Sequence, residues 1–563
     1  MKRQSSAQYT LRPLAAALLA LPLGALAADP VVPGAGTILQ QIQPASPPAS
    51  ASTGTGLSIE QQGGSQLPAS APFLVKNLQI TGNISFDTTT LHTLVADVEG
   101  QTLSLIQLVD LAGRITDYYH SHGYPLARAI IPAQTIREGG VTIEVIEARY
   151  GKIKLENQSR VHDPLLESTL SPLQGGQVVA KAELDHSLLL LSDIPGVVVN
   201  ATVRPGEAVG TSDLVVETTP GPAVSGYAAL DNYGSRYTGR ARLGGTVNIT
   251  NPLHHGDELT LSALSSGGEL YYGRLAYDVL LNGRGTRVGG AYSALHYKLG
   301  DSLADLAAHG TAQVESLWAK HPLVRSLSVN VYGQIQVDHQ SLRDHIDSAS
   351  IQTDRHLDFG TVNLAGDVRD TLLAGGVNAW NLGWTTGRVG FDDSAAQSAD
   401  ASSAKTEGSF SRWNASVNRL QTLSPNSALY LTVSGQWANG NLDSSQKMIA
   451  GGPYTVRAYD MGAVSGDTGT FGSAEFRHAL GMPWPGRWET IAFIDSAHMT
   501  VNKNPWATGS NSASLSGAGF GLNWSGQDHW SARAYVATRV GSKPDLVQST
   551  LATRGWIEID RQF

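Results

Sequence analysis

The chain has 563 residues, a formal net charge of −9 and no cysteine. Its length predicts roughly three or four domains, and the lack of any basic run argues against nucleic acid as a partner. Without cysteine there is no thiol nucleophile, no disulfide and no cysteine-ligated zinc site. The 61 glycines and 18 tyrosines are typical of a chain rich in strands and turns.

The first 27 residues have the pattern of a secretory signal peptide. Three basic residues come first, residues 14–26 form an apolar run, and Ala25-Leu26-Ala27 matches the small-x-small cleavage pattern. Neither this run nor any later stretch reaches the roughly 18 apolar residues of a membrane-spanning helix. Any membrane-spanning part is therefore expected to be a β-barrel, because only helices and closed barrels satisfy all backbone hydrogen bonds in lipid.

Residues 28–43 contain a candidate helix, and residues 44–72 are predicted to be a flexible linker. The helix is expected over residues 37–43, just after two glycines. Pro, Ser, Ala and Gly dominate the segment behind it, which carries Glu60 as its only charge and is unable to bury a core. Composition alone leaves two interpretations of residues 37–43: a short helix, or plain disorder.

Two consecutive segments, residues 73–148 and 149–220, share the predicted element order β-α-α-β-β. In the first, apolar spacing predicts strands over 75–80, 127–131 and 141–146 and helices near 89–97 and 105–123. In the second, the same reasoning predicts strands over 152–155, 197–203 and 213–217 and helices over 164–170 and 182–191. The chain is thus expected to contain two small α+β domains.

From residue 221 to residue 563, apolar and polar residues alternate repeatedly. Leu429, Leu431 and Val433 face one way, for example, while the intervening Tyr430 and Thr432 face the other. An apolar face toward lipid and a polar face inward is the pattern of a transmembrane barrel, and the length allows about 16 strands. A soluble sandwich also alternates, but its polar face would carry more charge.

A loop signal near residues 448–466 interrupts the alternation. Gly451-Gly452-Pro453 is unsuited to a strand interior, and the loop carries Arg457 close to Tyr459. Farther on, Asp495 stands alone among the apolar residues of a predicted strand. Spacing leaves two interpretations open: a buried Arg457–Asp495 ion pair that fixes the loop, or two unrelated solvated charges.

No pattern for catalysis or metal binding appears. The chain has no Gly-x-Ser-x-Gly elbow, phosphate-binding loop or His-Glu-x-x-His. His339, His345 and His356 lie among acidic residues in the polar stretch 338–358, which is predicted to be a solvated extracellular loop instead of a cation site. We therefore expect no enzyme activity, no cofactor and no metal.

Several motifs resemble those of one known family. Gly-Gly-x-x-x-Val-Arg-Ala-Tyr over residues 451–459 is similar to a lumenal-loop signature, and Phe-x-Asp-x-Ala over 493–497 to a strand motif. Residues 123–134 resemble a first POTRA domain. The family is that of the two-partner secretion transporters, the haemolysin secretion/activation proteins of the POTRA-barrel superfamily. Ala458 and Ala497 depart from the glycines usual in it.

The resemblance implies a fold and a set of site residues. Two periplasmic α+β POTRA domains would precede a transmembrane β-barrel of about 16 antiparallel strands in the bacterial outer membrane. The implied site residues are a lumenal-loop lock of Arg457, Asp495, Tyr459, Gly451 and Gly452, a pore-plugging helix with Ile38, Leu39 and Ile42, and a membrane-insertion signal at Phe563.

The resemblance also implies a function. The POTRA domains would capture an unfolded partner of the adhesin or haemolysin type through its N-terminal secretion domain, and the barrel would conduct it outward. Further partners would be outer-membrane lipid and, during insertion, the barrel-assembly machinery, with the transporter itself monomeric. Two alternatives are a barrel-assembly factor, which more POTRA domains would favour, and an outer-membrane enzyme, which would need a nucleophile with a histidine and an acid.

Overall fold

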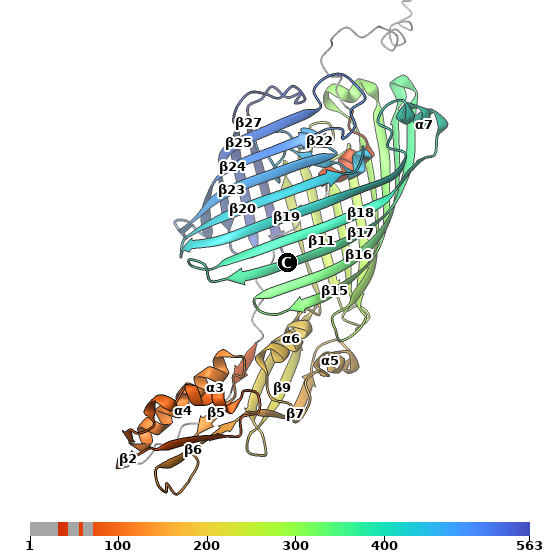
Figure 1. Ribbon diagram of the computed structural model, residues 1–563. Helices are drawn as coiled ribbons and strands as arrows, with labels where there is room; N and C mark the ends of the chain where they lie inside the picture. Colours follow the sequence, from red (N-terminus) through yellow and green to blue (C-terminus); the bar gives the residue numbers. More distant parts are fainter. Residues whose placement is uncertain (1–31, 43–55, 60–70) are drawn as a thin grey trace, which may run out of the picture.

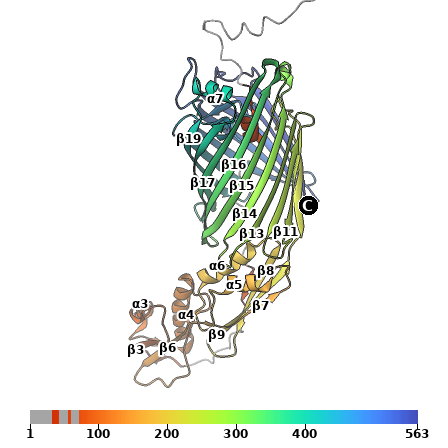
Figure 2. The same cartoon turned by 90° about the vertical axis from the view of Figure 1, so that its right-hand side faces the viewer.

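The computed structural model describes residues 32–42, 56–59 and 71–563. A barrel carries two small domains at one end, which we call the proximal end; the opposite end is the distal end (Figures 1 and 2). The predicted signal peptide, residues 1–27, and most of the predicted linker, residues 44–72, lie outside the described residues. Within the described residues, no helix has both the length and the apolar character needed to cross a membrane.

The first domain packs two helices on a three-stranded sheet of order β3-β6-β5. Helix α4 begins at a capping box in which Ser104 and Gln107 satisfy each other's backbone N–H groups. Its apolar face, with Leu108, Ile115 and Tyr119, is buried in the domain core. The elements are β2 (Phe73–Leu74), β3 (Asn77–Thr81), α3 (Thr88–Thr93), β4 (Thr102–Leu103), α4 (Leu105–Ser121), β5 (Arg128–Ile130) and β6 (Gly140–Ile146).

One buried carboxylate organises the first domain. Glu147 accepts hydrogen bonds from the N–H groups of Ile84 (2.8 Å) and Ser85 (2.7 Å), and from the hydroxyls of Ser85 (3.0 Å) and Tyr119 (2.8 Å). Burial raises the pKa of Glu147, but these donors outweigh it, and the pKa lies below its ordinary value of 4.5. The ionised group therefore stabilises the loop 82–86 against the end of α4.

We expect the substitution Glu147→Ala to loosen this domain at neutral pH. Unpaired buried donors cost about 1–3 kcal/mol, so amide exchange near residues 84–86 should accelerate roughly 5- to 150-fold. Because the folded-state pKa is lowered, the stabilisation is present above the unfolded-state pKa and is lost as pH falls through the folded-state value. The ratio of exchange rates, variant over wild type, should thus fall toward one in acid.

Hydrogen exchange at matched pH measures this ratio, since the intrinsic pH dependence cancels. Glu144→Ala is the matched control, because Glu144 lies on the exposed face of β6, near the same strand end. A ratio near one for Glu147→Ala at pH 7 would contradict the prediction.

The second domain repeats this arrangement. It consists of β7 (Arg149–Asn157), α5 (Asp163–Leu170), α6 (Lys181–Ser192), β8 (Val197–Pro205) and β9 (Thr211–Pro220). Its sheet has the order β1-β8-β9-β7, in which β1 (Leu57–Ile59) comes from the predicted linker. These three residues differ from the flexible segment predicted from composition. The physical reason is that Leu57-Ser58-Ile59 is an uncharged alternating tripeptide beside a strand edge with unpaired backbone groups.

Described residues 224–562 form a closed barrel of 16 antiparallel strands, which confirms the predicted architecture. The first eight are β10 (Val224–Asp231), β11 (Arg242–Thr250), β12 (Glu258–Ser265), β13 (Leu270–Leu280), β14 (Arg287–Lys298), β15 (Ala308–Arg325), β16 (Val329–Ile346) and β17 (Ile351–Asp370). The other eight are β18 (Gly376–Phe391), β19 (Gly408–Ser424), β20 (Ser427–Ala438), β23 (Thr468–Gly481), β24 (Arg487–Thr500), β25 (Ser512–Ser525), β26 (Trp530–Arg539) and β27 (Thr553–Gln562). Pairing of β10 with β27 closes the barrel.

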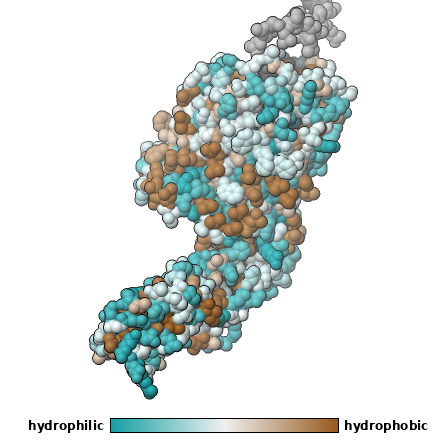
Figure 3. All heavy atoms as spheres, in the orientation of Figure 1, coloured by the Kyte–Doolittle hydropathy of each residue, from teal (hydrophilic) through white to brown (hydrophobic). Residues whose placement is uncertain are grey.

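Along the strands of the barrel wall, apolar side chains point outward and polar side chains point into the lumen. On β16, Ile335 and Val337 are 62% and 52% exposed on the outside, whereas Gln334 and Gln336 line the interior cavity. Figure 3 shows hydrophobic side chains gathered over the middle and lower part of the barrel, while the tip of the first domain is hydrophilic. An apolar outer band around a polar interior is what a lipid bilayer requires of a barrel.

The predicted extracellular loop over residues 338–358 is wrong. These residues continue β16 and β17, which are 18 and 20 residues long and are joined by the short turn Asp347–Ala349. About 9–11 residues suffice to cross a bilayer, so the extra length carries the hairpin beyond the apolar band at the distal end. There the outward side chains are polar, and the inward face mixes buried Leu342 and Leu357 with buried polar residues, which hides the alternation that would reveal a strand.

The second domain is held to the proximal rim of the barrel. Asp193 accepts a forked pair of hydrogen bonds from Arg325, at 2.7 and 2.8 Å. The amide of Asn251, in the turn after β11, donates to the carbonyl of Pro195. Strand β9 ends only four residues before β10 begins. The junction is therefore a short covalent link reinforced by an ion pair.

Candidate functional site: the lumenal loop and the pore helix

The connection between β20 and β23, residues 439–467, folds into the barrel, and we call it the lumenal loop. It contains a small hairpin of β21 (Met448–Ala450) and β22 (Val464–Gly466). Gly451 and Gly452 follow β21 with φ of +101° and +108°, where residues with a side chain are strained. A Cβ on Gly451 would also lie 2.4 Å from the carbonyl oxygen of Asp460. Both glycines are thus required for the loop to turn back on itself.

Arg457 at the tip of the loop reaches Asp495 on β24. Its Nε and one terminal nitrogen donate to the two carboxylate oxygens of Asp495 at 2.8 and 2.7 Å, and its backbone N–H donates at 3.1 Å. Arg457 is 4% exposed and Asp495 is fully buried. The structure therefore brings together the two residues that spacing left ambiguous, in the bidentate geometry of a strong charge-assisted pair.

Two further charged residues complete the cluster. Glu475 on β23 accepts from Arg457 at 2.7 Å through one oxygen and from Arg477 at 2.6 Å through the other. The two arginines and two carboxylates balance, so the buried cluster carries no net charge. The guanidinium of Arg457 also lies 3.4 Å from the ring centroid of Phe493, a cation–π contact.

The neighbours of Arg457 pack the loop against the barrel wall. Tyr459 is buried in an apolar cluster that includes Val456 and residues of β23 to β26. The methyl group of Ala458 faces Gly517 on β25, where a Cβ would come within 2.5 Å of it. Gly517 thus makes room for the alanine that stands at position 458.

The loop also contacts the strands that close the barrel. Trp556 on β27 donates its indole N–H to the carbonyl of Arg457 at 2.7 Å. Asp460 accepts from Arg554 on β27 at 2.7 Å and from Arg240, just before β11, at 3.3 Å. The loop therefore bridges β23 and β24 to the β10–β27 seam across the lumen.

A short helix, α2 (Ala35–Ile42), lies inside the barrel near its distal end (Figure 1). It overlaps the predicted helix over residues 37–43 but begins two residues earlier. Ile38 and Leu39 are 1% and 4% exposed and pack against apolar side chains of the barrel wall, while Ile42 is partly buried. Helix α2 thus occupies the lumen of the barrel.

Three charged residues hold the beginning of α2, and we call them the plug latch: Asp344, Arg355 and Asp443. Asp344 accepts from the N–H of Ala35 at 2.7 Å and from the Tyr297 hydroxyl at 2.6 Å. Arg355 donates to Asp344 at 2.7 Å and to Asp443 at 2.6 Å. A carboxylate at a helix N-terminus satisfies an otherwise unpaired backbone donor, so the latch fixes the helix to β16.

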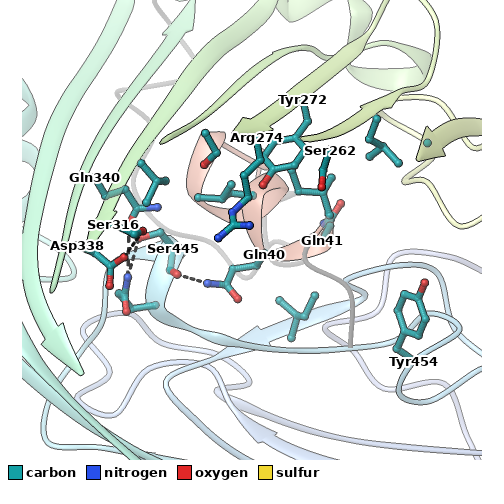
Figure 4. A pocket seen from close by; sticks show the side chains of 18 of the residues that line it. Gln40, Gln41, Ser262, Tyr272, Arg274, Ser316, Asp338, Gln340, Ser445 and Tyr454 are labelled. Carbon is teal, nitrogen blue, oxygen red and sulfur yellow. Dashed lines mark hydrogen bonds between the residues drawn. The ribbon is translucent and has the colours of Figure 1, made fainter. Parts of the chain in front are cut away.

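The helix also contacts the lumenal loop. The Gln40 amide donates to the carbonyl of Ser445 (Figure 4), and Asp443, from the plug latch, accepts from the Ser445 N–H at 2.8 Å. Below the C-terminal end of α2 lies a cavity of about 900 Å³. Figure 4 shows Ser262, Arg274, Ser316, Asp338 and Gln340 around it. The cavity is therefore largely polar, and residues 39–42 of the helix form part of its lining.

Sequence reasoning missed the plug latch and the role of Glu475. Asp344 and Arg355 lie in the polar stretch 338–358, where the sequence predicts a loop and gives the charges no partner. Glu475 precedes Arg477 by two residues, so both lie on one strand face, and that spacing is the signal that could have linked it to the cluster.

Phe563 ends the chain at the proximal end of the seam. Its N–H donates to the carbonyl of Gly226 at 3.0 Å, and the N–H of Gly226 donates back at 2.9 Å. The ring is 58% exposed.

Comparisons with known proteins identify the architecture. The family model described as "Haemolysin secretion/activation protein ShlB/FhaC/HecB" matches residues 210–524, more than half of the chain. The chain belongs to this family. A second model, "POTRA domain, ShlB-type", matches residues 73–148, the first α+β domain.

Relatives of this haemolysin secretion/activation family member are outer-membrane transporters. The heme/hemopexin transporter protein HuxB of Haemophilus influenzae strain 86-028NP is 29% identical over 79% of this chain and 80% of its own length. The outer membrane transporter CdiB of Escherichia coli is 22% identical over 80% and 76%. A solved structure of CdiB from Escherichia coli shares the fold, with a TM-score of 0.68, 21% identity and coverage of 91% and 94%. The protein is thus an outer-membrane transporter, with its POTRA end in the periplasm.

Proposed function

We propose that this transporter exports one large partner protein, which it captures unfolded in the periplasm and conducts through the barrel. The observation that carries the proposal is a polar cavity inside the barrel that is lined in part by α2, in a barrel that carries two α+β domains at its proximal end. A lipid-facing barrel with a permanently sealed interior would need neither feature.

Capture is proposed to occur by strand addition to a POTRA sheet edge. In this mode an extended polypeptide pairs its backbone with an edge strand, and pockets receive alternate side chains. Strand β5 forms an edge of the first domain. Ile130 on β5 and Ile106 and Val109 on the neighbouring α4 are 38%, 51% and 37% exposed. Exposed apolar side chains near this edge suit an unfolded, uncharged segment, which would replace the hydrogen bond that the Ala129 N–H donates to the Thr116 hydroxyl at 3.0 Å.

The lumenal-loop lock and α2 have structural roles in this proposal. Arg457, Asp495, Tyr459, Gly451 and Gly452 hold the loop against the wall, and α2, through Ile38, Leu39 and Ile42, keeps the pore shut until export begins. None of them performs a covalent step, so the protein acts as a conduit and not as an enzyme. In the described ranges, no group of three or more histidine or acidic residues is arranged to hold a metal ion.

The remaining partners follow from the same architecture. The exported protein would carry an N-terminal secretion domain, and outer-membrane lipid would surround the apolar band. Phe563, paired at the seam with its ring exposed, is proposed as the signal that the barrel-assembly machinery reads during insertion. The transporter is proposed to work as a monomer, since its barrel closes within one chain.

The test is co-expression with a candidate partner, sought among large secreted proteins encoded near the transporter gene, using wild type and a variant lacking residues 73–219. We expect the shortened barrel to insert, as shown by a heat-modifiable gel mobility, but to leave no partner in the medium. Export by the shortened form would contradict the proposal. A general fall in other outer-membrane proteins, with the partner unaffected, would instead indicate a barrel-assembly factor.

A further inference from the structure

Charged side chains line the cavity inside the barrel, and some of them have no partner of opposite charge. Of the described residues that line it, seven carry a charge, and four of these belong to ion pairs. The pairs are Asp231–Arg242 at 2.8 Å, Lys447–Asp467 at 3.0 Å and Glu558–Arg533 at 2.7 Å. Arg274, Arg412 and Asp338 are the other three. Two cations thus face the cavity against one anion.

Arg274 extends from β13 into the cavity, as Figure 4 shows. Within the described part of the chain, its guanidinium makes no hydrogen bond and no ion pair. Its cross-strand neighbours are Ser262 on β12 and Ser293 on β14, both uncharged. An arginine inside a membrane-spanning segment is costly unless it faces water, and one without a partner marks the path of an ion or a substrate.

Arg412 faces the same cavity from β19, six strands farther around the barrel than β13. Its guanidinium donates only to neutral amide oxygens, those of Asn414 at 2.6 Å, Gln436 at 2.9 Å and Gln446 at 3.2 Å. The amide nitrogen of Gln436 donates to the carbonyls of Gln446 and Asp467, which turns its oxygen toward Arg412. The positive charge is therefore fixed in position but not neutralised.

Asp338 on β16 only partly offsets these two charges. It is 8% exposed, and its carboxylate accepts hydrogen bonds from the Ser316 hydroxyl and the Gln336 amide. The cavity lining therefore has an excess of positive charge. Because lipid with a low dielectric constant surrounds the barrel, the field of such an excess is focused into the lumen.

We propose that Arg274 and Arg412 determine which polypeptide segments the pore admits. They favour acidic and neutral segments, and they disfavour segments rich in lysine and arginine, which meet repulsion from two sides of the cavity. This inference rests on the proposed export function and names the charge class of its substrate. The same two arginines make the open pore prefer anions to cations when no polypeptide is present, as rings of basic side chains do in anion channels.

The ion selectivity of the full-length channel tests the charge of the lumen without any partner protein. The reversal potential of its openings is measured in planar bilayers across a KCl gradient, because potassium and chloride ions have nearly equal mobility in water. We expect chloride to be roughly twofold more permeant than potassium in the wild type. Arg274→Gln should bring the permeability ratio close to one. The double variant Arg274→Gln, Arg412→Gln should invert it, because Asp338 then remains without an opposing charge.

Arg343→Gln is the matched control, because Arg343 is an exposed arginine on the outer face of β16. We expect it to keep the wild-type permeability ratio. Arg274→Gln removes no hydrogen bond of the described chain, so a change in its ratio reports the lost charge and not a misfolded barrel. Equal ratios in the wild type and the double variant would overturn the proposal.

Export of charged partner variants tests the choice of substrate. The co-expressed candidate partner carries an added short run of lysines or, in the matched form, of glutamates, and heat-modifiable gel mobility verifies barrel insertion. We expect the wild type to export the lysine form about fivefold less than the glutamate form, and the double variant to export both forms equally.

The outcomes of this export test separate the two proposals. Equal export of both forms by the wild type would refute the charge preference and leave the export function intact. Absence of even the unmodified partner from the medium would contradict the export function itself, while the permeability ratios would still decide the sign of the charge in the lumen.

Discussion

Replacing Arg457 with alanine should abolish export while leaving the barrel in the outer membrane. The change leaves Asp495, which is fully buried, without its ion-pair partner. It also removes the arginine that donates a hydrogen bond to one oxygen of Glu475. Removing one member of a buried ion pair costs about 3–5 kcal/mol, and water in the lumen would lessen this. The wall strands keep their backbone pairing, so the penalty falls on the lumenal loop, which should leave its position.

Three measurements on the same cells check this result: partner protein in the medium, heat-modifiable barrel in the membrane, and trypsin cleavage within residues 439–467. Arg477→Ala is the matched control, because Arg477 is an arginine bound to the same Glu475 but is far more exposed, at 27% of its side chain. We expect the control to export within a fewfold of wild type. Export by Arg457→Ala at the wild-type rate would show that the loop position is unimportant.

Replacing Asp344 with alanine should open the pore. This change removes the acceptor for the N–H of Ala35 and one of the two carboxylates that hold Arg355, so α2 loses its fixed start. A hydrogen bond to a charged group contributes about 1.5–3 kcal/mol, which corresponds to a roughly 10- to 150-fold shift toward the unplugged state. Arg355 keeps Asp443 as a partner, which limits the cost to the barrel itself.

Conductance in planar bilayers measures the fraction of barrels from which α2 has left the pore. Asp358→Ala is the matched control, since Asp358 is an exposed aspartate on β17 that bonds to His339 and does not touch the helix. We expect more frequent opening for Asp344→Ala, baseline behaviour for the control, and export in both. Wild-type conductance in Asp344→Ala would mean that apolar contacts alone retain α2.

Predictions from local pattern succeeded where one face of an element is buried or faces lipid. The alternation at Leu429, Leu431 and Val433 predicted barrel strands, because a bilayer imposes a period of two on every residue that it touches. Residues 338–358 escaped prediction, because beyond the bilayer the outer face is polar while the inner face mixes buried apolar residues, such as Leu342 and Leu357, with the charged residues that hold α2. The same reason hid the plug latch, two of whose members lie there.

The sequence by itself determined the two α+β domains, the transmembrane barrel and the candidacy of Arg457 and Asp495, since each rests on spacing within a short stretch. Only the tertiary structure decided that Glu475 joins this pair, that Arg355 connects Asp344 to Asp443, and that Leu57-Ser58-Ile59 pairs with β8. These contacts link residues up to 144 positions apart. Strand register and loop closure decide which of these distant residues meet, and neither produces a repeating pattern in the sequence.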